Sequence, residues 1–285
     1  MTRLSCSTQI KPQVLRHTFV SPQKAPMHEF SHGFLSDAMT AVRAEVLCNH
    51  ATWHELLLRV NAQCVEAQHA AQVDPTDSRA LLAAAHFARS LASVQGAVLL
   101  LEHGLVSQAK TVLRMALESL FALEALRVKP EIAADLARTH EVDKRVVADR
   151  MLQWEAPELK AAVAAQVSDD ELKGYLSSKA REVKTYELAR TADMLDWYLS
   201  LYAILSFPTH GAVSDLTAHL VTDQAGNVVA LKNEPEVEGQ EPAWAYAIEI
   251  ELKAAEAFAG IFNVAGLSLE APRNELRALV AKTEG

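Results

Sequence analysis

Two long apolar segments, residues 79–102 and 106–128, constrain the fold more than any other feature of the chain. Each segment keeps apolar side chains at helical spacing, and only the tripeptide "HGL" separates them. His103–Gly104 is typical of a helix end, because glycine readily adopts the left-handed backbone conformation found there. Helices joined by so short a connection pack against each other in antiparallel fashion. The sequence therefore predicts a central helical hairpin over 79–128.

The composition favours helices throughout the chain. Half of the 285 residues are hydrophobic, whereas Gly and Pro number only ten each. A sheet protein would need turn residues roughly every eight to twelve positions. We therefore predict an all-α fold, a multi-helix bundle that forms one domain over residues 28–285. Beyond the hairpin, apolar periodicity predicts helices at residues 34–47, 51–72, 186–206, 208–220, 243–264 and 272–282.

Three segments are expected at the periphery. Residues 1–27 are polar and contain several prolines, which is typical of a disordered or loosely docked arm. Residues 131–184 are charged and interrupted by Pro157 and Gly174, so we expect an insert of shorter helices, one of them starting with a capping box at Ser168 and Glu171. Residues 221–233 carry Gly226 between β-branched residues and predict a small β-hairpin.

Charge and cysteine content exclude several classes of function. The net charge of −9 gives no overall attraction to nucleic acid or to an anionic membrane, although a local basic groove stays open as an alternative. Cys6, Cys48 and Cys64 have no spacing typical of a disulfide framework or a zinc knuckle. There is no secretory signal and no run of membrane-spanning length. We expect a cytoplasmic protein with reduced thiols and no membrane contact.

The second helix of the hairpin carries a polar row. Lys110, Arg114 and Glu118 follow one another at four-residue steps and share one helix face among apolar neighbours. Arg114 and Glu118 are expected to pair, since an unpaired charge in a core costs several kcal/mol, roughly. Two interpretations stay open: an ion pair that fixes the helix position, or a cleft that binds an anion or another ligand.

A second polar row lies at Tyr202, Ser206 and His210, again at four-residue steps. Pro208 interrupts it and should end the preceding helix near Ser206. Ser206 is then expected to cap the helix that follows. His210 would lie in the first turn of that helix, where the helix dipole favours a neutral imidazole. Such a histidine is either a hydrogen-bonded packing residue or a base.

The segments "EHGLVSQAKTVLRMALESLFAL" and "WYLSLYAILSFPTHGAVSDL" resemble a bacterial family of helical domains of unknown function, DUF5677. The resemblance covers roughly residues 50–265. It implies an all-α bundle in which the two segments meet around one polar pocket, and it implies no known reaction. The residues that match the family pattern are Ala109, Arg114, Glu118, Tyr202, Ser206 and His210.

Bundles of this outline are similar to HEPN-type domains, many of which are ribonucleases of toxin and phage-defence systems. Those domains carry an Arg followed, after four to six residues, by a His. The spacing occurs here at Arg43–His50 and Arg79–His86, about as often as chance allows, and neither pair ends a late helix. In a ribonuclease, His210 would act as general base and Arg114 would stabilise phosphate charge.

One short motif suggests a metal-binding site. His28, Glu29 and His32 form an H-E-x-x-H pattern, which on a helix binds zinc in metallopeptidases. Gly33 follows directly and weakens that helix, and too few residues precede it for a substrate-binding sheet. His50 and His54 are a second, weaker pair. The chain has no glycine-rich phosphate loop, so we expect no cofactor.

The leading hypothesis is a ligand- or partner-binding module, in a phage-defence or toxin–antitoxin setting. The alternatives are an HEPN-like ribonuclease acting on RNA, with His210 and Arg114 as catalytic candidates, a zinc peptidase, and a structural module that forms a homodimer. The expected binding pocket consists of Arg114, Glu118, Tyr202, Ser206 and His210.

Overall fold

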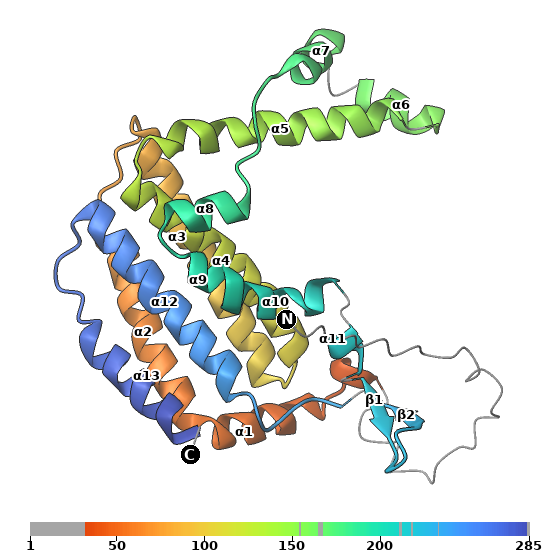
Figure 1. Cartoon of the computed structure of the whole chain (residues 1–285), viewed down its shortest axis with the longest axis vertical. Coiled ribbons are helices and arrows are strands. Elements are labelled where there is room, and N and C mark those ends of the chain that lie inside the picture. The colour runs from red at the N-terminus through yellow and green to blue at the C-terminus, as the bar shows by residue number, and fades with distance from the viewer. Residues whose placement is uncertain are drawn as a thin grey trace, which may run out of the picture.

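The computed structural model describes residues 32–153, 155–164, 168–210, 213–217, 219–232 and 234–283. The predicted all-α class and its central hairpin are confirmed. Helices α3 (Ser78–Glu102) and α4 (Val106–Val128) lie side by side and antiparallel (Figure 1). The division into an arm over 1–27 and one domain over 28–285 stays a prediction, because residues 1–31 lie outside the described residues.

Around the hairpin, the elements follow the predicted order with some breaks. Their bounds are η1 Gly33–Leu35, α1 Met39–Asn49, α2 Ala51–Ala70, α5 Ile132–Leu152, α6 Pro157–Ala164, α7 Asp169–Ser177, α8 Thr185–Thr191, α9 Leu195–Trp197, η2 Tyr198–Tyr202, α10 Ala203–Ser206, η3 Pro208–His210, α11 Val213–Thr217, β1 Leu220–Thr222, β2 Val228–Leu231, α12 Glu241–Phe262 and α13 Glu270–Thr283. Elements η1 and η3 are 3₁₀ turns, and η2 is a turn of π-helix.

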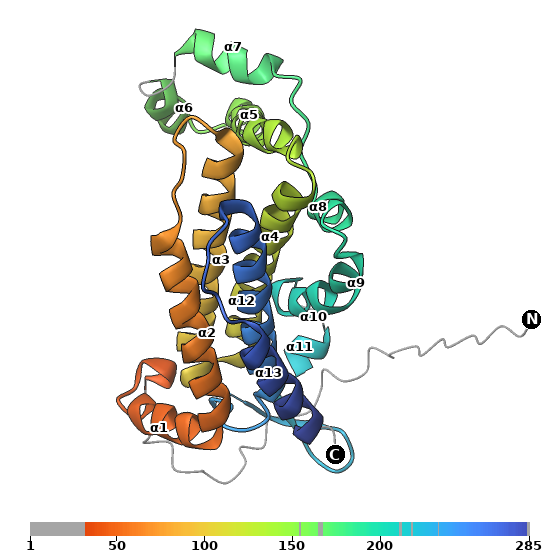
Figure 2. The same cartoon turned by 90° about the vertical axis from the view of Figure 1, so that its left-hand side faces the viewer.

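The core forms where α2, α3, α4 and α12 meet. Helix α12 packs against the other three, and Figure 2 shows it between α2 and α4. Phe87 of α3 and Phe258 of α12 are fully buried and stack with ring centroids 4.0 Å apart. Helix α3 is also long and apolar enough to cross a membrane by length and composition alone. Its packing against α4 and α12 gives its buried apolar side chains partners within the bundle.

The connection between α3 and α4 ends the helix as the sequence predicts. Gly104 has a φ of 69°, and the N–H groups of Gly104 and Leu105 donate to the carbonyls of Leu101 at 2.8 Å and Leu100 at 2.9 Å. This paired arrangement is the Schellman motif. The Glu236 N–H donates to the Gly104 carbonyl at 2.9 Å, so the loop also holds the segment that leads into α12.

The helix predicted over 186–206 is interrupted, which corrects the sequence interpretation. Helix α8 ends at Thr191, and Asp193 adopts a φ of 56°. The Met194 N–H donates to the Ala189 carbonyl at 2.8 Å, a second Schellman-type bond. Aspartate tolerates this conformation better than most residues, and no glycine marks the break. The chain then resumes through α9, η2 and α10. Helix α10 packs on α4, as do α8 and η3, and Tyr198 and Tyr202 of η2 contact Phe121 of α4.

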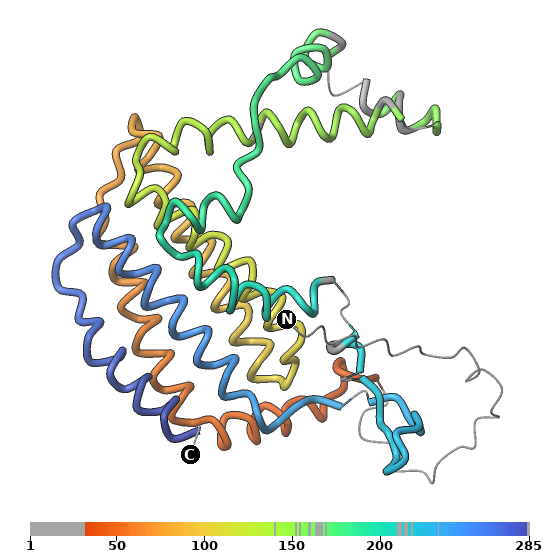
Figure 3. The backbone as a smooth tube through the Cα atoms, viewed as in Figure 1, coloured from red at the N-terminus to blue at the C-terminus, as the bar shows by residue number. Residues whose placement is uncertain are grey.

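Within the described residues, the segment 131–184 is helical and the segment 221–233 holds a β-hairpin, as predicted, but α5 has 21 residues and is not one of the short helices expected there. Helix α5 extends away from the bundle, and the backbone returns from α7 to α8 through residues 178–184 (Figure 3). The capping box is present, with the Glu171 N–H donating to the Ser168 hydroxyl and the Ser168 N–H donating to the Glu171 carboxylate. Strands β1 and β2 form the small antiparallel hairpin, with Gly226 at a φ of 82° in its turn.

Candidate functional site

The two polar rows meet where η2 packs on α4. An Arg114 guanidinium N–H donates to the Tyr202 hydroxyl at 2.7 Å, and that hydroxyl donates to Glu118 Oε1 at 2.9 Å. The predicted pair also forms directly, with Arg114 Nη2 3.1 Å from Glu118 Oε1. We call these three residues, Arg114, Glu118 and Tyr202, the Arg114 network. Both charged side chains keep about a quarter or less of their surface exposed, 21% and 25%, so the pair is neither sealed in the core nor fully solvated.

Burial and charge set the protonation of the network. Desolvation raises the pKa of the Tyr202 phenol, the Arg114 hydrogen bond opposes that rise, and Glu118 adds to it. The phenol is therefore a neutral donor to Glu118 at physiological pH. The Arg114 guanidinium also lies 5.0 Å from the centre of the Tyr202 ring, within cation–π range. The Tyr202 ring in turn stacks on Tyr198 at 4.9 Å, which limits its movement.

Tyr202 is the last residue of the π-turn η2. A turn of π-helix holds one extra residue and rotates the side chains that follow, and such turns are frequent at functional sites.

Ser206 Oγ donates to the Tyr202 carbonyl at 2.6 Å. Ser206 is thus the last residue of α10 and bonds backwards, so its predicted role as cap of the next helix is wrong. A hydroxyl at this spacing competes for the carbonyl one turn earlier.

His210 is only partly tested. Its backbone belongs to η3, which packs on α4, but its side chain lies outside the described part of the structure. Its membership of the pocket stays a prediction.

Glu118 also borders a cleft of about 320 Å³, which we call the His86 cleft. Helices α3, α4 and α5 form three of its sides, and Val183 with the start of α8 forms the fourth. This volume lies at the lower end of the range that holds small ligands, roughly 300–1,000 Å³. The residues that line the cleft are Leu82, His86, Arg89, Glu118, Ala122, Leu136, Thr139, Asp143, Val183, Thr185 and Leu188.

His86 is the most perturbed polar group in the cleft. Burial, together with the positive charge of Arg89, lowers its pKa to about 4, so the imidazole is neutral at pH 7. Its Nδ1 is buried and has no hydrogen-bond partner among the described residues. Sequence analysis noted His86 only as the end of the Arg79–His86 spacing. Arg79 itself donates from Nε to the Leu126 carbonyl at 2.9 Å and does not act with His86.

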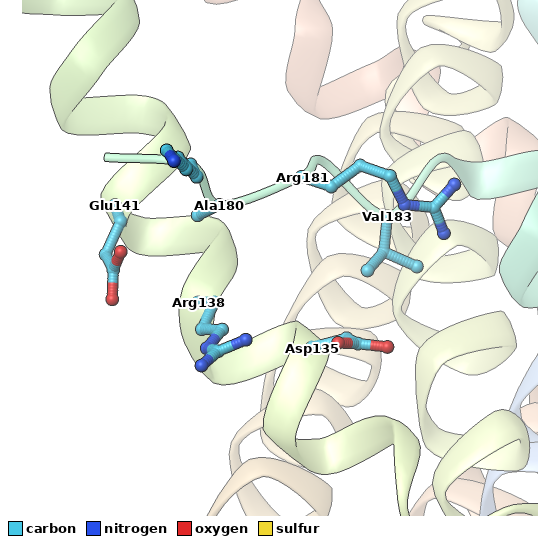
Figure 4. Close-up of a pocket in the computed structure, with 7 residues that line it drawn as sticks. Asp135, Arg138, Glu141, Ala180, Arg181 and Val183 are labelled. Carbon is cyan, nitrogen blue, oxygen red and sulfur yellow. The ribbon is translucent and has the colours of Figure 1, made fainter. Parts of the chain in front are cut away.

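Two further cavities lie on the other side of Val183. One, of about 290 Å³, separates α5 from residues 179–183, and Figure 4 shows its lining. There the Glu141 carboxylate and the Arg181 guanidinium point in opposite directions. Both are already engaged, Glu141 by the Ser178 hydroxyl at 2.7 Å and Arg181 by Glu187 at 2.9 Å. The second, of about 160 Å³, shares the Arg181–Glu187 pair. Unlike these two cavities, the His86 cleft borders the Arg114 network through Glu118 and contains a buried histidine nitrogen without a hydrogen-bond partner among the described residues.

The histidine motifs do not assemble a metal site in the described part of the chain. His28 and Glu29 lie outside the described residues, while His32 precedes η1. His54 Nε2 lies 3.1 Å from Glu102 Oε1, and Arg43 donates to Glu102 Oε2 at 2.7 Å. His50 is buried beside Trp244. Across the described ranges, no three His, Cys, Asp or Glu residues could hold a metal ion together.

The site falls within the part of the chain that matches a known family model. Residues 80–227 match the family of unknown function DUF5677. The chain belongs to this family. The match covers all of α4 and the segment from α5 through β1, and it therefore includes the Arg114 network and the His86 cleft. No match was found among curated proteins or solved structures, so the comparison supplies a family without an activity.

The Tyr202 hydroxyl should contribute measurably to stability. We expect Tyr202→Phe to lower the free energy of unfolding by about 1–2 kcal/mol, because Arg114 and Glu118 each lose a partner while their direct contact remains. Urea denaturation measures the change. Tyr186→Phe is the control, since Tyr186 is exposed and makes ring contacts only. Equal effects of the two substitutions would contradict a structural role for the bridge.

Proposed function

We propose that this protein is a ligand-binding module, that the His86 cleft holds the ligand, and that the Arg114 network fixes Glu118 at its edge. The position of Glu118 carries the proposal. Its Oε1 accepts hydrogen bonds from the network, and the same residue lines the cleft. A polar group held by neighbours before the ligand arrives loses little entropy on binding.

The make-up of the cleft supports a small ligand. Apolar side chains of Leu82, Leu136, Val183 and Leu188 alternate with a few polar groups, as in typical small-molecule sites. The perturbed pKa of His86 is a further mark of functional sites.

The ribonuclease alternative gains less support from the geometry. A phosphate-stabilising arginine should present an uncompensated charge to the substrate. Arg114 instead contacts Glu118 at 3.1 Å and donates to Tyr202. RNA binding would follow only if that pair opened. The phage-defence or toxin–antitoxin setting, the bacterial and cytoplasmic location, the homodimer and the absence of cofactor and membrane contact stay predictions.

Blocking the cleft tests the proposal. The probes are leucine, 3-methylbutylamine, 4-methylpentanoate and adenosine monophosphate, each at millimolar concentration. At least one probe should raise the midpoint of thermal unfolding of the wild type, because a ligand that binds only the folded state stabilises it. The shift should vanish in Thr139→Trp, which fills the cleft, and persist in Thr222→Trp on the surface strand β1. A shift that survives Thr139→Trp, or none with any probe, would overturn the proposal.

A further inference from the structure

We propose that the His86 cleft binds a zwitterion built like an apolar α-amino acid, with a carboxylate, a protonated amine and a short apolar body. This inference rests on the proposed function and names the chemical class of the ligand.

Two charged residues of the cleft come from different helices, are exposed to solvent and lack protein partners within the described part of the chain. Arg89 of α3 and Asp143 of α5 both line it, and neither forms an ion pair with any described residue. Glu118 of α4 is neutralised only at Oε1, since no described donor reaches its Oε2. A cation on the α3 side and carboxylates on the α4 and α5 sides match a ligand that carries both signs of charge.

Other charge types fit less well. A dianion such as a phosphate monoester would meet one guanidinium and two carboxylates, and like-charge contacts disfavour such a ligand. A simple amine would leave Arg89 without a partner and facing another cation. A metal ion lacks the three ligands it needs among the described residues.

An amino acid satisfies each group in turn. Arg89 can hold the ligand carboxylate through two parallel N–H donors. Asp143 and the free oxygen of Glu118 can accept from its ammonium group. The apolar side chain then contacts Leu82, Leu136 and Val183, which complete the cleft wall. His86 stays neutral at pH 7 and adds no further charge to the cleft.

Isothermal titration calorimetry of the full chain tests the charge pattern. The titrants are leucine, methionine, 4-methylpentanoate and 3-methylbutylamine, with adenosine monophosphate as the dianionic comparison. We expect leucine or methionine to bind about tenfold or more tightly than the acid or the amine, because each of those lacks one charged contact. Circular dichroism of each variant confirms that it is folded.

Matched variants connect the binding to the cleft. Arg89→Met and Asp143→Asn should each weaken amino-acid binding about tenfold or more. Arg150→Met and Asp149→Asn change exposed residues of α5 outside the cleft and should leave binding unchanged. If neither amino acid binds while adenosine monophosphate binds in a manner blocked by Thr139→Trp, the zwitterion is overturned and the proposed function stands. If no titrant binds, both the zwitterion proposal and the proposed function are overturned.

Discussion

Glu251→Met should raise the free energy of unfolding by about 1–3 kcal/mol at pH 4, the cost of a buried polar group left without a partner, and by more at pH 7. Glu251 lies on α12 in the centre of the bundle, with 1% of its surface exposed. Neither carboxylate oxygen has a hydrogen-bond partner among the described residues. Its backbone carbonyl accepts a weak bond from the Cys64 thiol of α2 at 3.7 Å, which leaves the carboxyl group itself unsatisfied.

The gain should depend on pH in a defined direction. Burial raises the pKa of Glu251 well above its ordinary value of 4.5. Between the unfolded and folded pKa values the folded chain binds more protons, so rising pH lowers stability by about 1.4 kcal/mol per pH unit. Below the unfolded pKa both states are protonated and this effect disappears. The difference between Glu251→Met and the wild type should therefore widen from pH 4 to pH 7.

Urea denaturation across that pH range measures both effects. Glu249→Met is the control, since Glu249 is on the same helix but only partly buried and should change stability by less than about 0.5 kcal/mol. A difference between Glu251→Met and wild type that stays constant with pH would show that Glu251 is ionised in the folded state.

The elements that the sequence predicted best are those that local chemistry determines. The ends of α3 and α4 follow from His103–Gly104 and from Pro130 after α4, and the capping box at Ser168 is a local contact. The break at Asp193 was missed because its left-handed conformation comes without glycine. The Ser206 cap was wrong for a related reason, since a serine can bond forwards or backwards along the chain.

In the candidate site, too, the local contacts could be predicted from spacing along the sequence and the contacts between distant segments could not. Arg114 and Glu118 lie one turn apart on a single helix, so their pairing could be inferred from spacing. Tyr202 joins them from 84 residues beyond Glu118, and the resemblance to the family supplied that link. The His86 cleft depends on how α5 and residues 183–188 lie against α3. No local signal encodes that packing, so Arg89 and Asp143 had no mark in the sequence.

The second large effect is expected at Gly104, which ends α3 and determines how α4 starts. Gly104→Ala should lower the free energy of unfolding by about 2–4 kcal/mol. Alanine is strained at the positive φ of this position, and its Cβ atom would overlap neighbouring backbone. A Cβ atom there would lie 2.8 Å from both the backbone N and O of Glu236. Since those atoms belong to the segment that Gly104 holds next to α12, backbone would have to move to relieve the contact.

Substitutions at two other glycines distinguish backbone strain from steric overlap as the cause of the lost stability. Gly239→Ala imposes alanine on a similar φ of 70° where nothing lies within 4 Å, so it measures the backbone cost alone, about 1 kcal/mol. Gly174→Ala places alanine in the open helix α7 and should stabilise it slightly. If Gly104→Ala cost no more than Gly239→Ala, the Glu236 segment would move away freely. The α3–α4 loop would then not position the start of α12, the helix that packs against both halves of the hairpin that bears the site.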